Sequence, residues 1–469
     1  SGEAASANNA SGRKARELAE LYSEYEKTLD ENGLADAYRP QYDALEILED
    51  KSKAPGVLEV VEEAGIIGIY DPGELRFRIF TALAGRVRNT RLRIPYNPQR
   101  EDLFAFMYGT VRRFELLGGI FDGFDPAEMF TEEQEESGES ALSAVRPYIL
   151  LPPSQTARLK RVCPDGSITV IKAFGRYKEM EEIGREIRRL MESGVPASEI
   201  AVIFRDAEEY AEMAEDVFSR FRIPCELRRR VPLLSSPFAR HVNLLLETAA
   251  KGEDADAQAG VSRLLSSGYT DSSAGEKELA ESVKRLGGAM TRLARLSALV
   301  DFLNKWTRKG ADYSGEEAAA MRELDAAIAG MESAWKIRGG DAETSAAEFK
   351  DEFIEALSRR RLERESSPPS GVKILSALDA VGLKWDYVFI GGLSDGQFPQ
   401  KRYETPVFSD AEKRAFNMAV KRTAFRHMEE LSKEETLLFC LAFYSARKKA
   451  CLTWSAENDD GQPQPRSSF

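Results

Sequence analysis

The sequence predicts an α/β fold in which parallel sheets are interrupted by an all-helical insertion. Between residues 168 and 227, short apolar runs typical of strands alternate with amphipathic helical repeats, and the turns between them are short. From about 246 to 365 the apolar residues recur only at helical spacing, and strand-like runs return after 371. The length of 469 residues allows about three domains.

The composition limits the function classes. Hydrophobic residues make up 42% of the chain, and 65 Lys and Arg stand against 78 Asp and Glu, a net charge of -13. This balance excludes a protein that coats nucleic acid through bulk charge alone, so any DNA contact must come from local basic clusters. With two histidines, four cysteines and no CxxC or HExxH spacing, we expect neither a metal site nor a histidine-based triad.

The termini and the hydropathy pattern bear on location. No apolar run approaches the roughly 18 residues that a membrane span needs, and no signal pattern opens the chain, so we expect a cytoplasmic protein without membrane contact. The chain begins at Ser1 without a methionine and ends in a polar stretch. We therefore expect a piece excised from a longer protein.

The N-terminal part predicts one amphipathic helix and then a β-α-β unit. The helix should close at Asn32-Gly33, since glycine favours the end of a helix. An acidic stretch without apolar residues, 132–139, predicts a loop near a domain boundary. The predicted elements are a helix over 18–29, a strand over 64–70, a helix over 75–83 and a strand over 91–96.

The central part gives the clearest pattern of the sequence, βαβαβ with short loops. The glycine and proline of Gly194-Val195-Pro196 end its first helix. The predicted elements are strands over Ile168–Ala173, Ile200–Phe204 and Ile223–Leu227, and helices over Lys178–Ser193 and Ala207–Phe221. This order is that of a doubly wound parallel sheet.

The insertion is predicted to contain three helices, and the sheet resumes after it. A hinge-like linker, 366–371, separates the two. The helical periods run over 279–306, 321–335 and 349–357, and the later elements are strands over 372–375, 387–390 and 450–454 with a helix over 432–443.

Three stretches resemble motifs of superfamily 1 helicases of the UvrD/Rep type. Glu186–Leu234 resembles a segment of their second RecA-like domain, Val372–Pro399 (VKILSALDAVGLKWDYVFIGGLSDGQFP) resembles motif V, and Glu434–Ser455 (EETLLFCLAFYSARKKACLTWS) resembles motif VI. Together they cover about half the chain and are most like the degenerate helicase-like half of AddB-type helicase-nuclease subunits. The resemblance implies RecA-like, P-loop NTPase-like sheets.

The domain organisation follows from this resemblance. We expect a partial first RecA-like domain with a helical subdomain and a second RecA-like domain that a 2B-like helical insertion splits. The predicted divisions are 1–150 for the first RecA-like part, 151–245 and 371–469 for the two parts of the second, and 246–370 for the insertion.

The nucleotide-binding motifs of the family are missing or eroded. The chain has no GxxxxGK[ST] loop to cradle phosphates, and after the strand ending at Tyr70 only Asp71 stands near the place of the magnesium-holding carboxylates. In the motif V stretch, Gly382 remains, but Leu378 and Val381 stand where the family has His and Lys.

The motif VI stretch has lost its phosphate-sensing arginine. Ser445 takes that place, and Arg447 lies two residues on and would point elsewhere if the segment is helical. An arginine at this position contributes several powers of ten in rate where it operates, so its loss argues against hydrolysis. We expect no catalytic residue in this chain.

The family resemblance also implies what lies outside the chain. Pro465–Phe469 sits where AddB-type proteins reach the end of this region, before a nuclease with an iron-sulfur cluster. We interpret Cys440 and Cys451 as ordinary core cysteines. We therefore expect no cofactor here, with ATP/Mg and an iron-sulfur cluster only in the missing parts of a parent helicase/exonuclease.

Candidate DNA-binding residues lie near the expected carboxyl edge of the sheet. Arg205 closes the strand over Ile200–Phe204, where parallel sheets place ligands, although a surface pair with Asp206 or Glu208 is an equal alternative. A basic triplet after the third strand could meet phosphates or be a solvated turn, and strand aromatics could stack bases or fill the core. The predicted set is Arg205, Phe204, Arg229, Arg230, Ser376 and Trp385.

Three functions remain open from the sequence. The first is an inactive helicase-like scaffold that binds single-stranded or tailed duplex DNA and docks an AddA-like helicase subunit in recombination and repair. The second is a fragment of an active ATP-dependent superfamily 1 helicase whose Walker motifs lie upstream. The third is a protein-interaction module without DNA binding, which the net charge of -13 favours slightly.

Overall fold

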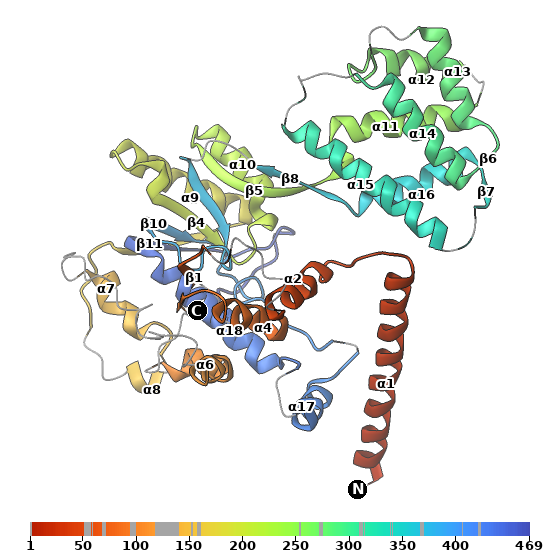
Figure 1. Cartoon of the computed structure of the whole chain (residues 1–469). Coiled ribbons are helices and arrows are strands. Elements are labelled where there is room, and N and C mark those ends of the chain that lie inside the picture. Colours follow the sequence, from red (N-terminus) through yellow and green to blue (C-terminus); the bar gives the residue numbers. More distant parts are fainter. Residues whose placement is uncertain are drawn as a thin grey trace. The chain divides into compact units, whose positions relative to one another are not determined.

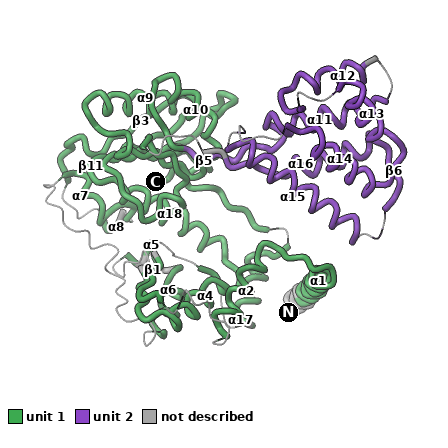
Figure 2. Tube along the Cα trace, turned by 45° about the horizontal axis from the view of Figure 1, so that its top comes forward, with its two compact units in different colours: residues 1–226, 367–469 green, residues 227–366 purple. Residues whose placement is uncertain are grey.

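The computed structural model divides the chain into two compact units. Unit 1 comprises residues 1–226 and 367–469, and unit 2 comprises residues 227–366 (Figure 2). The first region and both parts of the sheet domain thus share one unit, and the expected finer division into two RecA-like domains stays a prediction. The structure describes residues 2–50, 58, 60–67, 72–93, 100–117, 140–151, 153–156, 161–252, 255–271, 275–308, 313, 315–337, 339, 341–365, 370–405, 407–420 and 424–469.

The centre of unit 1 is a parallel sheet, as the sequence predicts. Its strands pair in parallel in the order β3-β11-β10-β4-β9, and the strand order continues with β5, which passes from unit 1 into unit 2, and with β8 of unit 2. The mixed α/β architecture is consistent with a RecA-like fold. The strands are β3 (Ile168–Ala173), β4 (Ile200–Phe204), β5 (Cys225–Pro232), β8 (Arg361–Glu365), β9 (Val372–Ser376), β10 (Trp385–Ile390) and β11 (Ala446–Ser455).

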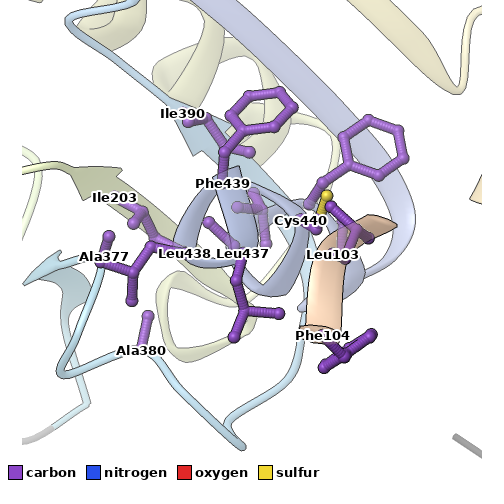
Figure 3. Close-up of a cluster of buried hydrophobic side chains, with 14 of the residues drawn as sticks. Leu103, Phe104, Ile203, Ala377, Ala380, Ile390, Leu437, Leu438, Phe439 and Cys440 are labelled. Atoms are coloured by element: carbon purple, nitrogen blue, oxygen red, sulfur yellow. The ribbon is translucent and has the colours of Figure 1, made fainter. Parts of the chain in front are cut away.

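Helices lie on both sides of β10 and β11 (Figure 1). On one side α9 (Arg176–Glu192) packs against β3, β11 and α10 (Ala211–Arg220). On the other, α18 (Met428–Tyr444) buries Leu437 and Phe439 in a cluster with Ile203 and Ile390 of the sheet (Figure 3). The central strand β4 is buried at every position, which explains its uninterrupted apolar sequence.

The N-terminal β-α-β prediction is confirmed in type but not in its boundaries. Strands β1 (Glu63–Ile67) and β2 (Asn89–Arg93) pair in parallel around α4 (Gly73–Ala84). Both strands begin earlier than predicted, and Asp71 lies outside the described residues, as does the acidic stretch 132–139. The other helices of this region are α1 (Gly2–Glu31), α2 (Arg39–Glu49), α5 (Glu101–Phe104), α6 (Tyr108–Glu115), α7 (Ala141–Val145) and α8 (Pro153–Thr156), and α17 (Asp410–Val420) lies in the C-terminal part of the chain.

Unit 2 is helical apart from short strands. The run over 279–306, predicted as one helical period, is two helices, and the first ends at Gly287, where a Cβ would lie 2.4 Å from the Ala249 carbonyl oxygen. The elements are α11 (Pro237–Ala250), α12 (Ala255–Ser266), α13 (Glu276–Gly287), α14 (Arg292–Trp306), α15 (Gly315–Ile337) and α16 (Ala346–Ser358), with two-residue strands β6 (Met290–Thr291) and β7 (Glu343–Thr344).

The third strand of the central pattern was predicted too short. β5 continues through the basic triplet to Pro232 and pairs antiparallel with β8, so Arg228 faces Glu365 and Arg230 faces Glu363. The triplet is therefore part of a ribbon and not a turn after the strand, and the prediction was wrong here. The ion pair between Arg230 and Glu363 favours this pairing.

The remaining sequence predictions concern cysteines and membranes. Cys440 and Cys451 are buried, as predicted, and burial raises the pKa of the Cys440 thiol to about 12 and that of Cys451 to about 11. Cys163 is exposed. Within the described part of the chain, no helix is both long and apolar enough to cross a membrane.

Candidate functional site

A buried ion pair marks the carboxyl edge of the sheet. Arg205 follows the last residue of β4 and holds Glu435 of α18 in a forked arrangement, with Nε 2.7 Å from Oε2 and Nη2 2.7 Å from Oε1. The side chain of Glu435 is 1% exposed and that of Arg205 is 19% exposed. The sequence suggested Asp206 or Glu208 as local partners of Arg205. The partner is instead Glu435, which lies 230 residues further along the chain.

Glu435 is the centre of a wider network. Its Oε2 accepts a bond from the Gln400 backbone N–H at 3.0 Å, and its Oε1 accepts one from Arg402 at 2.9 Å. Burial opposes ionisation, but the hydrogen bonds from Arg205 and Gln400 outweigh it and hold the pKa of Glu435 below its usual value. A single carboxylate thus joins the end of β4, the loop after β10 and α18.

A small polar pocket of about 110 Å³ opens beside this network. Tyr210 forms one wall, and its hydroxyl donates to Oε1 of Gln397 at 3.1 Å. Gly392 has a φ of 71°, and a Cβ there would lie 2.7 Å from the Tyr210 hydroxyl, so the wall requires glycine. The lining residues are Arg205, Asp206, Glu209, Tyr210, Gly392, Gly396, Gln397 and Gln400.

A second buried carboxyl group bonds to the backbone of a residue that lines the pocket. Glu179 of α9 accepts hydrogen bonds from the Gly392 backbone N–H at 2.8 Å and from the Thr453 hydroxyl at 2.6 Å. Its Oε2 has no partner among the described residues. Burial raises the pKa of Glu179, against the opposing effect of the hydrogen bonds from Thr453 and Gly392.

Burial removes the two predicted aromatic residues as stacking surfaces. Phe204 is fully buried and stacks on Tyr210, with ring centroids 3.9 Å apart. Trp385 is 7% exposed, and its backbone N–H donates to the Ser445 carbonyl at 2.9 Å. Base stacking needs an accessible ring face, so the core alternative holds for both residues in this structure.

The motif V stretch contributes a hydroxyl contact at the carboxyl edge of the sheet. Ser376 ends β9, and its hydroxyl accepts a bond from the Ala207 backbone N–H at 3.0 Å, which joins two loops at the carboxyl edge. Gly382 has a φ of 82°, a conformation that favours glycine. Leu378 is 53% exposed where the family has a histidine, so no polar group replaces that side chain.

The motif VI stretch places a buried hydroxyl where the family has its arginine. Ser445 caps the end of α18, is 2% exposed and donates to the Ala442 carbonyl at 2.6 Å. Arg447 is exposed on β11, a strand and not a helix. Neither side chain belongs to the pocket lining.

The predicted basic residues divide between the two units. Arg229 and Arg230 lie on β5 in unit 2, and Arg230 forms an exposed ion pair with Glu363 at 3.7 Å. Arg205 and Ser376 belong to unit 1. The described part of the chain has no group of three or more His, Cys, Asp or Glu side chains that could hold a metal ion.

Sequence reasoning missed the two carboxyls and Tyr210. Glu435 was visible as the second glutamate of the motif VI stretch, and its place beside a buried helical face was the available signal. Glu179 and Tyr210 carried no signal beyond helical periodicity.

Comparison with known proteins supports the resemblance drawn from these stretches. No family model matches the chain. A protein of Symbiobacterium thermophilum is 24% identical over 392 residues, which cover 67% of this chain and 33% of that protein. One of Bacillus subtilis is 25% identical over 250 residues (50% and 20%), and one of Clostridium novyi is 30% identical over 115 residues (24% and 10%).

All three relatives carry the same name, that of the AddB subunit of an ATP-dependent helicase/deoxyribonuclease. The chain spans a third or less of the length of each. The resemblance predicted from the three motif stretches is confirmed: the chain is AddB-like.

Proposed function

We propose that the chain is a helicase-like module that binds DNA and docks a partner, without hydrolysing ATP itself, within an AddB-like helicase-nuclease of recombination and repair. The observation that carries the proposal is the closed network around Glu435. This carboxylate already engages Arg205 and Arg402 at the sheet edge where a phosphate would need cations. A nucleotide would have to break a buried, hydrogen-bonded ion pair to use them.

The eroded motif positions support the same proposal. Ser445 is buried and bonded to its own helix, so it cannot take the part of an arginine that stabilises a transferred phosphate. The relatives' shared name is that of a subunit, which supports a role inside a larger assembly.

The cofactors of such an assembly belong to other parts of it in this proposal. ATP with magnesium needs a phosphate loop, which the sequence lacks, and an iron-sulfur cluster needs clustered thiolates. Cys440 and Cys451 do not fit that second role, because the described part of the chain has no group of three or more side chains that could hold a metal ion.

The partner in this proposal is an AddA-like helicase subunit. Helix α1 exposes an apolar stripe in which Leu21 is 68% and Tyr22 is 51% exposed. Exposed apolar surface of this kind is typical of a protein interface. The stripe also favours the alternative function of a protein-interaction module that binds no DNA.

The test is fluorescence anisotropy of labelled single-stranded and duplex DNA across a salt series, with ATP hydrolysis measured in the same samples. The proposal predicts single-strand binding whose affinity, on a logarithmic scale, falls linearly with the logarithm of salt concentration, and no hydrolysis. Absence of binding at low salt would leave the protein-interaction module. DNA-stimulated hydrolysis would instead support a fragment of an active helicase.

Arg205→Ala is expected to weaken single-strand binding by roughly tenfold at low salt, because Glu435 then keeps only Arg402 as a cationic partner and the carboxyl edge of the sheet becomes more negative. The matched control is Lys448→Ala, which removes an exposed cation paired with Asp386 near the amino end of β11. Both variants are first compared by circular dichroism. Unchanged affinity of a folded Arg205→Ala protein would remove Arg205 from the DNA site.

A further inference from the structure

Unit 1 exposes an aromatic and basic cluster at the carboxyl ends of β3 and β11. Val170 and Phe174 are 68% and 61% exposed, Lys172 lies between them in the sequence, and Trp454 is half-buried. Alternation along a strand places residues 170 and 172 on one face of the sheet, and the register sets Lys172 beside Trp454. None of these residues belongs to the predicted DNA-binding set.

The lysine lies between two aromatic rings. Its Nζ is 5.1 Å from the centroid of Phe174 and 5.5 Å from that of Trp454. Within the described part of the chain, Lys172 has neither a hydrogen bond nor an ion pair. The neighbouring Arg176, in contrast, is neutralised by Asp459 and by Glu209 at 3.6 Å.

The backbone holds Phe174 in a fixed place. Gly175 donates its N–H to the Ser455 hydroxyl at 2.9 Å, and Ala456 donates its N–H to the Ala173 carbonyl at 2.9 Å. Gly175 has a φ of 95°, which turns the chain directly into α9. A large exposed ring on a rigid scaffold provides a preformed contact surface.

We propose that single-stranded DNA lies across this cluster, with bases stacked on Phe174 and Trp454 and a phosphate against the Lys172 ammonium. The proposal rests on the proposed function and names a site for it. Accessible rings interleaved with a cation are what sequence-tolerant single-strand binding requires. The cluster also lies at the carboxyl ends of parallel strands, where such sheets bind ligands.

Charge supports DNA over an apolar protein segment as the occupant. The chain carries a net charge of -13, so a polyanion can approach only where a cation is locally uncompensated. Lys172 supplies that cation, and an apolar segment would leave its ammonium buried without a partner.

The first experiment measures the affinity of a labelled oligothymidylate by anisotropy. Phe174→Ala is expected to lower the affinity by about 5- to 150-fold, the range for loss of one stacked base. Lys172→Ala is expected to reduce the slope of log affinity against log salt by about one. The matched control is Tyr403→Ala, another exposed aromatic residue of unit 1 (79% exposed), which should bind like the wild type.

Tryptophan fluorescence reports the same site directly. The chain has four tryptophans, of which Trp306, Trp335 and Trp385 are only 6 to 7% exposed. Quenching by unlabelled oligothymidylate should therefore come from Trp454. Trp454→Phe is expected to abolish the quenching but to keep most of the affinity, because it retains a ring.

The outcomes separate this inference from the proposed function. If the wild type binds the oligonucleotide and folded Phe174→Ala binds it equally well, this site is wrong and the proposed function stands. If the wild type binds no DNA, both fail. Loss of a partner protein from Phe174→Ala, with DNA binding intact, would assign the cluster to protein docking and overturn the inference.

Discussion

Each unit holds an arginine largely out of solvent, but the partners of the two arginines differ. In unit 1, Arg205 meets the carboxylate of Glu435, and the pair joins distant segments beside a pocket. In unit 2, Arg295 is 1% exposed and donates only to carbonyl oxygens, those of Leu286, Gly288 at 2.7 Å and Thr344 at 2.8 Å.

The difference in partners distinguishes a candidate ligand site, at Arg205, from the structural cap of a helix, at Arg295. Leu286 lies in the last turn of α13, so Arg295 satisfies the carbonyl end of a helix, where a cation is favourable. Arg205 and Glu435 instead hold opposite charges together at the edge where parallel sheets bind ligands. We therefore expect ligand-dependent changes in unit 1, while the arginine of unit 2 acts on stability alone.

The largest expected effect comes from Glu435→Ala. Two arginines would lose their shared buried carboxylate, and breaking such a pair from one side costs about 3–5 kcal/mol. Urea unfolding, with hydrogen exchange of β4 and α18, measures the loss in unit 1. The control is Glu429→Ala, on the same helix, whose exposed pair with Lys433 should contribute below about 0.5 kcal/mol. Equal effects of the two variants would contradict the central role of Glu435.

The second largest effect is expected in the pH dependence of stability, which should differ between the two units. His241 of α11 is buried, and burial lowers its pKa to about 4 from 6.5. The unfolded chain therefore binds the proton first, so stability of unit 2 is full above pH 6.5 and falls by up to about 3 kcal/mol as pH drops toward 4. Because the pKa of Glu435 is lowered in the folded chain, unit 1 loses the stability that this ionised carboxylate contributes only as pH falls below about 4.5.

Hydrogen exchange of α11 between pH 6.5 and 5 measures this effect. His241→Leu removes the titrating ring and should flatten the pH dependence of unit 2 in that range. An unchanged slope in the variant would show that another group is responsible.

The smallest of the three effects is expected for Arg295→Met. The substitution keeps most of the side-chain volume but leaves carbonyl oxygens of α13 and β7 without a donor, which costs about 2 kcal/mol. Exchange of α13 and α14 should accelerate, while exchange of β4 and single-strand DNA binding should not change. A loss of DNA binding would mean that the cap has a functional role after all.

The sequence predicted those parts of the fold whose signal is local. β3 and β4 were predicted residue for residue, because each is a short run rich in β-branched residues and bounded by turn residues. The boundary between α13 and α14 was missed, because the apolar period continues across Gly287 although the helix ends there. β8 was missed because its charged residues carry no apolar alternation and its pairing with β5 is non-local.

The candidate site was harder to predict from the sequence for the same reason, because its contacts are not local. Arg205 was found from its place after a strand, but its partner Glu435 is brought to it only by the sheet order. Phe204 and Trp385 were chosen for ring chemistry alone, and burial decides against them. Phe174 and Trp454 have the same chemistry, but only the folded chain distinguishes an open ring from a core ring.

The sheet order also has a consequence for biosynthesis. Among the strands that the structure describes, the neighbours of the early strands β3 and β4 are β11, β10 and β9, all of which follow unit 2 in the chain. A ribosome needs on the order of 10 s to add residues 227–366. During that interval unit 2 is a continuous segment with a hydrophobic cluster of its own, whereas the apolar β4 has neither of its neighbouring strands. Unit 1 is therefore the part of the nascent chain that most needs protection by a chaperone.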